Sequence, residues 1–394
     1  MSKDPVVIVE ALRTPMGSYL SSLKRLSATD LGAVAVRGTV FMTNLSANDI
    51  DEVIMGCVLP AGVGQAPARQ VALKAGLSNE TAATTINKVC GSGMRAVMMA
   101  TTQILAGESE VVLAGGMESM SNAPLLIKRP GKKEKPDFSD PKDHLFWDGL
   151  YDAYKKGTPM GEFAEVTAEK YKLSREDQDA FTIESVKRAQ EYMKGNGYIR
   201  EVIPISVKEG DEVKEISKDE PVERAKIEKI PELKPAFKKD GTITAANASG
   251  LSDGASVLLL MRESMAKKYK LTPRAKIVAQ ATAAREPEWF TIAPTKAIKS
   301  VLDKAKWSKK DVDLFEINEA FSVVPMAVMQ DLDIPHDKVN VHGGACAMGH
   351  PIGASGARIL VTLLNALENK NLKKGVASIC IGGGEATAMA IEVI

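Results

Sequence analysis

Cys90 lies in a segment that suits nucleophilic chemistry, because Gly-Ser-Gly follows it directly. A strand pattern ends near Asn87 and an apolar helix pattern follows the glycines, which predicts that Cys90 lies at a strand-to-helix turn. Unpaired backbone N–H groups and the positive end of a helix dipole favour a thiolate at such a turn. We therefore expect an ionised, nucleophilic sulfur; the alternative is a buried structural cysteine.

A second glycine-rich segment contains His350 directly before Pro351. Proline disfavours helical geometry in the residue before it, so we expect the imidazole on an irregular turn that precedes a helix. An imidazole held there suits a general base for a thiol. The alternatives are a satisfied core histidine, a phosphate cradle that lacks the Lys-Ser/Thr ending of a P-loop, and a metal-binding face of His342, Cys346 and His350, which the intervening glycines disfavour.

Two further strand ends carry candidate groups. Cys380 ends an apolar run and leads into a glycine turn, so it is a second thiol that could move protons, or an ordinary core cysteine. Gly382 in that turn offers a backbone N–H to an oxyanion. Asn318, in Glu-Ile-Asn-Glu-Ala-Phe, ends another strand pattern and could orient a water or a carbonyl.

The elements that must position these groups alternate between short apolar strands and helices, which is typical of parallel α/β sheets. The expected strands are Val6–Val9, Glu52–Cys57, Thr84–Asn87, Glu110–Ala114, Lys276–Ala284, Val312–Ile317, Lys338–Val341, Val376–Ile381 and Thr387–Val393. The expected helices are Thr29–Met42 (capped by Thr29 or Asp30), Gln65–Ala75, Met94–Leu105, Gly161–Lys172, Arg175–Lys194, Pro294–Lys306, Ala320–Gln330 and Ala354–Leu367.

The chain also shows an insertion and an internal similarity. Residues from about Asn122 to Ala246 are rich in Lys, Glu and loop patterns, so we interpret them as a lid inserted between two α/β halves. The segments 91–118 and 353–385 share a small-residue turn, an Arg, an apolar helix, an apolar strand, Gly-Gly and an acidic residue. Such order and spacing favour a duplicated unit over chance recurrence of glycine turns.

Composition excludes several functional classes. Lys+Arg 51 against Asp+Glu 50 leaves a net charge of +1 over 394 residues, so no global field favours nucleic acid or an anionic membrane. The most apolar segment, Ala96–Leu105, is too short to span a bilayer. The four cysteines include no CxxC pair, so we expect neither a disulfide framework nor a metal site. We expect no leader peptide before Val6–Val9 and a cytoplasmic location.

Together, the four motifs resemble the thiolase family (acetyl-CoA acetyltransferases and 3-ketoacyl-CoA thiolases). The resemblance rests on Cys-Gly-Ser-Gly at Cys90, Asn-Glu-Ala-Phe at Asn318, Gly-His-Pro-Ile-Gly-Ala-Ser-Gly at His350 and Cys-Ile-Gly-Gly-Gly at Cys380, in this order. It implies a thiolase-like α/β fold, with duplicated α/β halves in a five-layered αβαβα arrangement and an inserted loop (lid) domain. The expected boundaries are 1–121 plus 247–270 for the N-terminal half, 122–246 for the lid over coenzyme A, and 271–394 for the C-terminal half.

The resemblance also implies catalytic roles. Cys90 would be the acylated nucleophile, activated by His350. Cys380 would be the acid/base that acts on the acetyl carbon. Asn318, through a bound water, and His350 would form one oxyanion hole, and the backbone N–H groups of Cys90 and Gly382 would form the other.

For binding, the resemblance implies that Ser249 contacts the pantetheine arm, Arg224 meets the nucleotide end, and Met160 lines the acyl pocket. Pro159 and Phe290 depart from the pattern of short-chain biosynthetic members, which carry His before the Met and a Met-Gly pair, respectively. His342 stands where Asn is usual, and we interpret it as a structural substitution. No tightly bound cofactor or metal is expected; coenzyme A and acyl-CoA thioesters are the expected substrates.

The predicted function is therefore that of an acyltransferase. It would condense two acetyl-CoA to acetoacetyl-CoA, cleave 3-ketoacyl-CoA by thiolysis, or both, through an acyl-Cys90 intermediate. The alternatives are a longer-chain degradative thiolase, a condensing enzyme of the ketoacyl-synthase type, and a non-catalytic acyl-CoA carrier. The expected partners are acyl-CoA thioesters, coenzyme A and further copies of the chain in a homodimer or homotetramer, with no nucleic acid and no membrane.

Overall fold

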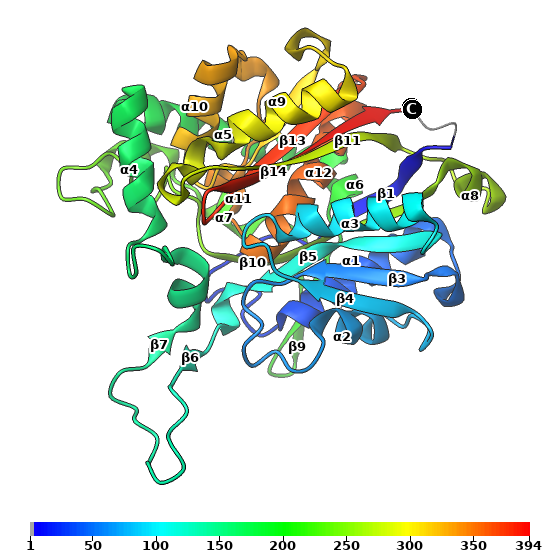
Figure 1. Cartoon of the computed structure of the whole chain (residues 1–394), viewed down its shortest axis with the longest axis horizontal. Helices are drawn as coiled ribbons and strands as arrows, with labels where there is room; N and C mark the ends of the chain where they lie inside the picture. The colour runs from blue at the N-terminus through cyan, green and yellow to red at the C-terminus, as the bar shows by residue number, and fades with distance from the viewer. Residues whose placement is uncertain (1–3) are drawn as a thin grey trace.

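Strands from both ends of the chain join in one mixed, ten-stranded sheet in the computed structural model, which describes residues 4–394 (Figure 1). The strands are β1 (Val6–Arg13), β2 (Gly17–Ser18), β3 (Glu52–Gly56), β4 (Ala82–Ile86), β5 (Val111–Ser119), β10 (Ser252–Arg262), β11 (Ala275–Ala284), β12 (Leu314–Ile317), β13 (Lys374–Ile381) and β14 (Glu385–Val393). Their order is β12-β13-β14-β11-β1-β10-β5-β3-β4, and β2 pairs with β10. The pairing of β1 with β11 joins the two halves of the sheet.

Helices cover both halves of the sheet and separate them. Helices α1 (Ala28–Thr43) and α2 (Pro67–Lys74) pack on the outer face of the first half, while α9 (Ala293–Ala305) and α10 (Val323–Leu332) pack on the outer face of the second. Helices α3 (Ser92–Ala106) and α12 (Ile352–Asn369) share one buried apolar cluster with strands of both halves. The molecule is therefore a five-layered αβαβα structure, which confirms the expected fold class.

The middle layer is packed main chain against main chain. Helix α12 is buried from Ile352 to Leu367, because sheet strands lie on both of its sides. Helix α3 approaches it so closely that a Cβ atom on Gly93 would lie 2.7 Å from the backbone nitrogen of Ala357. Gly356 on α12 has no room for a Cβ atom either, because Met94 occupies that space. Only glycine permits this approach, so these positions set the spacing between the two helices.

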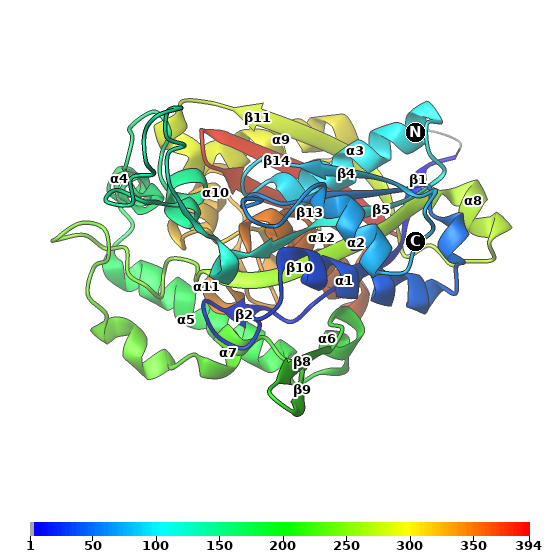
Figure 2. The same cartoon turned by 90° about the horizontal axis from the view of Figure 1, so that it is seen from below.

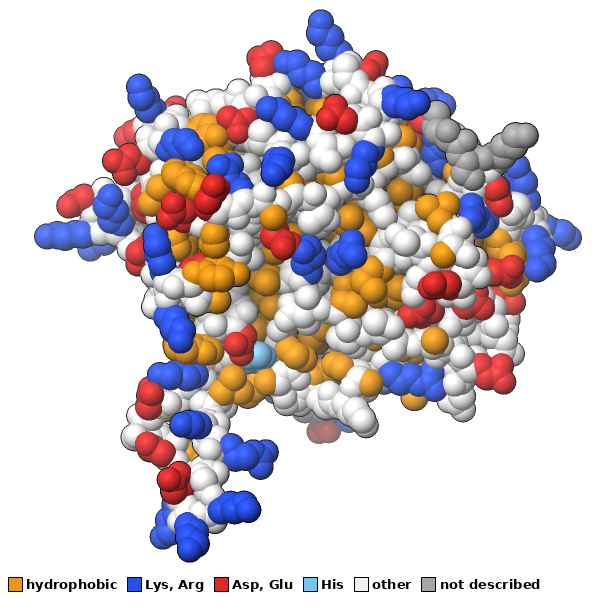
Figure 3. All heavy atoms as spheres, in the orientation of Figure 1, with side chains coloured by type: hydrophobic (Ala, Val, Ile, Leu, Met, Phe, Trp, Pro, Cys, Tyr) orange, Lys and Arg blue, Asp and Glu red, His pale blue; other side chains and the backbone are white. Residues whose placement is uncertain are grey.

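The insertion between β5 and β10 contributes helices and two hairpins. These are β6 (Leu125–Leu126) with β7 (Lys142–Asp143), α4 (Met160–Tyr171), α5 (Arg175–Tyr192), α6 (Asn196–Glu201), β8 (Ile205–Glu209) with β9 (Glu212–Ile216), and α7 (Glu220–Arg224). Figure 2 shows α5 and α7 together on one side of the molecule. The arm between β6 and β7 projects from the body and carries Lys and Arg side chains (Figure 3). The remaining short helices are α8 (Glu263–Lys268) and α11 (Ala345–Met348).

The structure corrects several expectations. The sheet is mixed rather than parallel, because β10 runs antiparallel to both β1 and β5, and β14 runs antiparallel to both β11 and β13. The long strand β10 and the hairpin β8–β9 were not predicted. Lys338–Val341 is not a strand; Val339 forms only an isolated bridge to Phe315. Helix α1 is capped by Ser27 in a capping box with Asp30, rather than by Thr29 or Asp30. Within residues 4–394, no helix is long and apolar enough to cross a membrane.

A buried ion-pair network fastens the insertion to β1. Arg13 at the end of β1 is fully buried; its guanidinium donates to Glu201 Oε1 at 2.5 Å and to the two carboxylate oxygens of Asp219 at 2.7 and 2.9 Å. The Tyr192 hydroxyl donates to Glu201 at 2.6 Å. Because charges in a dry interior depend on their partners, this network makes the insertion part of the body rather than a loose cover.

Replacing Arg13 by methionine should lower the free energy of unfolding by about 3–5 kcal/mol, because it leaves two buried carboxylates without their cation. Equilibrium urea unfolding measures this loss. Lys194→Ala, which removes an exposed ion pair with Glu191, is the control and should change the free energy by less than about 0.5 kcal/mol. A similar, small effect for Arg13→Met would show that the network does not hold the insertion.

Candidate active site

A cavity of about 480 Å³ lies where turns of both halves meet the insertion. Cys90, His350 and Gly382 line it from the two halves, and Met160 and Ser249 line it from the covering segments. The structure thus brings together five of the predicted site residues, although they are distributed over nearly 300 positions of the chain. The rest of the wall is mainly apolar, with aromatic side chains from Phe146, Tyr151, Phe237, Phe290 and Phe321.

A larger surface depression, of about 660 Å³, does not show the same convergence. Its most buried cation, Arg274, is already paired with Glu10 and with Glu368. Arg274 and the two acidic residues of this depression therefore satisfy one another, and the smaller cavity is the candidate active site.

Cys90 lies on the turn between β4 and α3, as predicted. The turn is strained: Val89, a β-branched residue, has φ 46°, in the left-handed region. Local bonds hold it, because the Ser92 hydroxyl accepts from the Lys88 amide at 2.8 Å and donates to the Val89 carbonyl at 2.7 Å. The backbone N–H groups of Gly382 and of Cys90 itself both donate to the sulfur. These are the two N–H groups of the predicted second oxyanion hole, and their role toward a substrate oxygen stays a prediction.

The expected ionisation of Cys90 is wrong for the protein without a bound ligand. Burial raises the pKa of the Cys90 thiol to about 11, and the charge of Glu118 acts in the same direction. The two backbone donors lower this pKa, but they do not outweigh the loss of water around a thiolate. At neutral pH the resting sulfur is consequently a thiol.

His350 lies on the turn between α11 and α12 and is 6% exposed. Its Nδ1 lies 2.6 Å from the Ser355 hydroxyl, which itself donates to the Pro351 carbonyl at 2.9 Å. The hydroxyl proton is therefore in use, so Nδ1 carries the ring proton and Nε2 keeps a lone pair. Burial and the positive charge of Arg358 lower the pKa of His350 to about 3, which leaves a neutral imidazole whose Nε2 can accept a proton.

Asn318 is adjacent to this imidazole. Its Nδ2 lies 3.5 Å from His350 Nε2, and its Oδ1 accepts from Arg358 at 3.4 Å. Arg358 is itself held by a buried ion pair with Glu316 at 3.0 Å. The side-chain amide is thus oriented with its NH₂ group toward the histidine.

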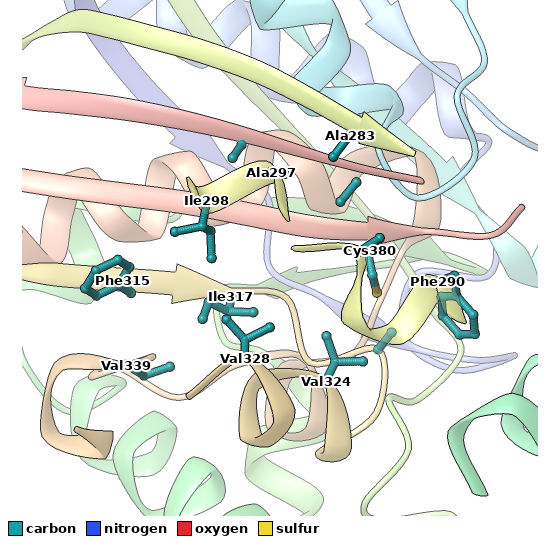
Figure 4. Packing of buried hydrophobic residues seen from close by; sticks show 14 of the residues in the cluster. Ala283, Phe290, Ala297, Ile298, Phe315, Ile317, Val324, Val328, Val339 and Cys380 are labelled. Atoms are coloured by element: carbon teal, nitrogen blue, oxygen red, sulfur yellow. The ribbon is translucent and has the colours of Figure 1, made fainter. Parts of the chain in front are cut away.

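Cys380 lies at the end of β13, beside the turn that carries Phe290 (Figure 4). Burial and the neighbouring Cys90 sulfur raise the pKa of Cys380 well above its usual value. Two residues further on, Gly382 donates its N–H to Cys90. Cys380 is therefore a protonated thiol next to Cys90, although it does not itself line the cavity.

Arg224 is not brought to the cavity. Its guanidinium pairs with Glu220 at 2.7 Å and with the Ser21 hydroxyl at 2.9 Å, and its side chain is largely exposed. Ser249 lies in the cavity wall, where its hydroxyl donates to the Ala320 carbonyl at 3.0 Å. The contacts of Arg224 and Ser249 with coenzyme A thus stay predictions.

His342 has a structural place, as interpreted from the sequence. It stacks on Tyr192 with ring centroids 3.7 Å apart, and burial lowers its pKa to about 4. Cys346 points elsewhere, toward the carbonyls of Asn247 and Glu319. In the part of the chain that the structure describes, no group of three or more His, Cys, Asp or Glu residues could hold a metal ion.

Sequence reasoning missed the residues that orient the predicted ones. Ser355, Arg358 and Glu118 fall within the noted repeat segments, but no role followed from that pattern. Glu118 is fully buried and accepts from the amides of Gly353, Val58 and Leu59 at 2.9, 3.0 and 3.1 Å. The signal in the sequence was the Arg and the acidic residue that each repeat segment carries. A polar residue that is buried needs a hydrogen-bond partner, so these residues were candidates for orienting others.

The family comparison agrees with the fold and the site. A family model described as the thiolase N-terminal domain matches residues 6–264, and one described as the thiolase C-terminal domain matches residues 271–393. The chain belongs to the thiolase family and is an acyltransferase, which confirms the resemblance.

Individual relatives are similar along the whole chain. A protein of Dictyostelium discoideum named probable acetyl-CoA acetyltransferase is 47% identical over 99% of this chain and 94% of its own length. An acetyl-CoA acetyltransferase of Allochromatium vinosum is 45% identical over 98% of both chains. Among solved structures, the acetyl-CoA acetyltransferase of Bacillus anthracis has a TM-score of 0.95 at 40% identity over 99% of both chains. The Acat5 thiolase of Ascaris suum, in complex with coenzyme A, has a TM-score of 0.92 at 42% identity, over 99% of this chain and 100% of its own.

The raised pKa of Cys90 predicts how fast iodoacetamide alkylates the free enzyme. Only the thiolate reacts, so the rate at Cys90 should rise about tenfold per pH unit from pH 7 to 10, without a plateau. Peptide mapping after timed quenching measures the rate, and N-acetylcysteine, which should level off near its pKa of about 8.5, is the reference. A plateau below pH 8 at Cys90 would contradict the neutral resting thiol.

Proposed function

We propose that the protein is an acetyl-CoA C-acetyltransferase that condenses two acetyl-CoA to acetoacetyl-CoA and catalyses the reverse thiolysis. One observation carries the proposal: a thiol, a neutral imidazole whose Nε2 can accept a proton, and two N–H groups directed at the sulfur meet at one apolar cavity. The names of the relatives favour acetyl over longer acyl groups. No feature of the cavity favours a non-catalytic carrier.

In the acyl-transfer half, the Cys90 sulfur attacks the thioester carbonyl of acetyl-CoA while His350 Nε2 accepts the thiol proton. The carbonyl oxygen becomes an oxyanion, which the N–H groups of Cys90 and Gly382 stabilise; each donor contributes about 3 kcal/mol. The adduct collapses to acetyl-Cys90, and His350 returns its proton to the departing coenzyme A thiolate. The step starts from an uncharged thiol and an uncharged imidazole. The negative charge that then forms on the carbonyl oxygen is stabilised by the two backbone N–H groups.

In the carbon–carbon half, a second acetyl-CoA enters the same cavity. The Cys380 thiol first passes its proton to His350 Nε2, and the resulting thiolate removes a proton from the methyl group. The enolate oxygen is stabilised by the N–H now on His350 Nε2 and by a water held by Asn318. The enolate carbon then attacks the carbonyl of acetyl-Cys90, and the Cys90 sulfur leaves and takes the proton back from His350. Two acid/base groups are needed because one proton moves at the Cys90 sulfur and another at the methyl carbon. His350 serves the sulfur and Cys380 serves the carbon.

The substrate and assembly follow from the same proposal. Coenzyme A would lie against Ser249 and Met160, with its nucleotide toward the insertion and Arg224, and no tightly bound cofactor is needed. The edge strand β4 ends the sheet with partly exposed residues, so a second copy could pair there in a homodimer or homotetramer. We retain the cytoplasmic location and the division at 1–121 plus 247–270, 122–246 and 271–394 as predictions.

Brief exposure to acetoacetyl-CoA should add one acetyl group to the protein, and Cys90→Ser should abolish this adduct because the nucleophile is gone. Intact-protein mass spectrometry measures the adduct, and kcat should fall at least about a thousandfold. Cys346→Ser, which changes a cysteine outside the cavity, is the matched control and should keep the adduct. An unchanged adduct in Cys90→Ser would exclude Cys90 as the nucleophile.

Cys380→Ala should separate the two halves of the reaction. Acetylation of Cys90 by acetyl-CoA needs only His350 and the N–H donors, so it should persist, whereas exchange of the acetyl methyl protons with D₂O should fall at least about a hundredfold. Mass spectrometry follows both. If exchange continued at the wild-type rate, Cys380 would not be the base that acts on carbon.

A further inference from the structure

The catalytic sulfur and one of its donors come from different halves of the molecule. Cys90 lies on the turn between β4 and α3, whereas Gly382 lies on the turn between β13 and β14. The Gly382 N–H nevertheless donates to the Cys90 sulfur, so the two turns must keep a fixed separation. A displacement of about 1 Å in such an arrangement costs on the order of a hundredfold in rate.

One side-chain ion pair joins these two turns. Lys88, two residues before Cys90, pairs with Glu385, three residues after Gly382. The side chains are 24% and 36% exposed, so the pair is partly buried, and its neighbours Val89 and Gly382 line the cavity. It spans the same gap as the contact between Gly382 and the sulfur.

The backbone at this place needs restraint. Val89, between Lys88 and Cys90, is in a left-handed conformation that a β-branched residue adopts only under constraint. Gly91 lies so close to Ile381 that it has no room for a Cβ atom. The two turns are therefore in close contact, and the backbone of one of them is strained. An ion pair between the turns opposes their separation.

The other repeat has a corresponding link. Glu118 ends the repeat segment of the first half, as Glu385 ends that of the second. Glu118 accepts from the Gly353 amide at 2.9 Å, three residues after His350. In each half, the acidic residue that ends the repeat segment thus contacts the turn of the other half that carries Cys90 or His350.

We propose that Lys88 and Glu385 form a positioning pair that holds the Gly382 N–H against the Cys90 sulfur. Neither residue touches the reacting atoms; they act through the spacing of the two turns. The inference rests on the proposed role of Cys90 as nucleophile. An ordinary surface ion pair of this exposure would contribute little, which is the outcome that the experiments must distinguish.

Steady-state kinetics of acetoacetyl-CoA thiolysis provide the first test. Lys88→Gln and Glu385→Gln should each lower kcat about tenfold and leave KM within about twofold, because turn spacing rather than substrate binding changes. The double variant should lose no more than either single variant, since one interaction is lost in all three. Lys88→Arg, which keeps the cation, should restore at least half of the wild-type kcat. Losses that multiply in the double variant, or no rescue by arginine, would overturn the proposal.

The chain offers a matched control on the same strand. Lys276 pairs with Glu392 at 2.8 Å, with side chains 30% and 22% exposed, at the opposite end of β14 from Glu385. Lys276→Gln should leave kcat within about twofold of the wild type. An equal loss in Lys276→Gln would mean that any ion pair on β14 has this effect, and the proposal would fail.

Alkylation of Cys90 by iodoacetamide at pH 8 provides a test that does not require thiolase activity. Loss of the pair should weaken the N–H bond to the thiolate and slow alkylation of Cys90 about threefold in Lys88→Gln and in Glu385→Gln, but not in Lys276→Gln. Unchanged rates would overturn the positioning role even if Cys90 proved to be the nucleophile. If Cys90 accepted no acetyl group in the wild type, the proposed function would fail, whereas the alkylation rates would still report on the turns.

Discussion

Backbone contact between α3 and α12 is the constraint on which the site depends. The two helices begin at Ser92 and Ile352, two residues after Cys90 and His350, respectively. Because glycine lets the helices meet at main-chain distance, flexible side chains have little influence on how far apart their N-termini lie. One half of the sheet packs on each side of this middle layer, so the sulfur and the imidazole are carried by a rigid support.

The same enclosure determines the charge state of the site. Burial raises the pKa of Cys90 to about 11 and lowers that of His350 to about 3, so both groups rest uncharged. A resting thiolate–imidazolium pair would instead place two charges in a poorly hydrated site before substrate binds, which burial disfavours. In the proposed reaction, charge forms first on the thioester oxygen, beside the two backbone N–H groups that face the sulfur.

The sequence was sufficient for residues whose chemistry is local. Cys90 and His350 stand in glycine-rich turns before helices, and both turns could be located from apolar periodicity. The ionisation of Cys90 could not be predicted, because it depends on the protein that surrounds the sulfur rather than on its neighbours in the chain. Ser355 could not be assigned as the partner of His350 without knowing how the first turn of α12 orients its hydroxyl. Lys338–Val341 has the composition of a strand, but it pairs with a neighbouring strand only through one isolated bridge, from Val339 to Phe315.

Strand β10 shows a further limit and has its own consequence. It lies between β1 and β5, although the whole insertion separates it from β5 along the chain. On the ribosome, Ser119 therefore emerges long before Ser252, and the first half of the sheet lacks β10 throughout that interval. Both waiting strands would expose unpaired edges that invite pairing with other nascent chains. These edges become covered only when β10 has been synthesised and pairs with both strands.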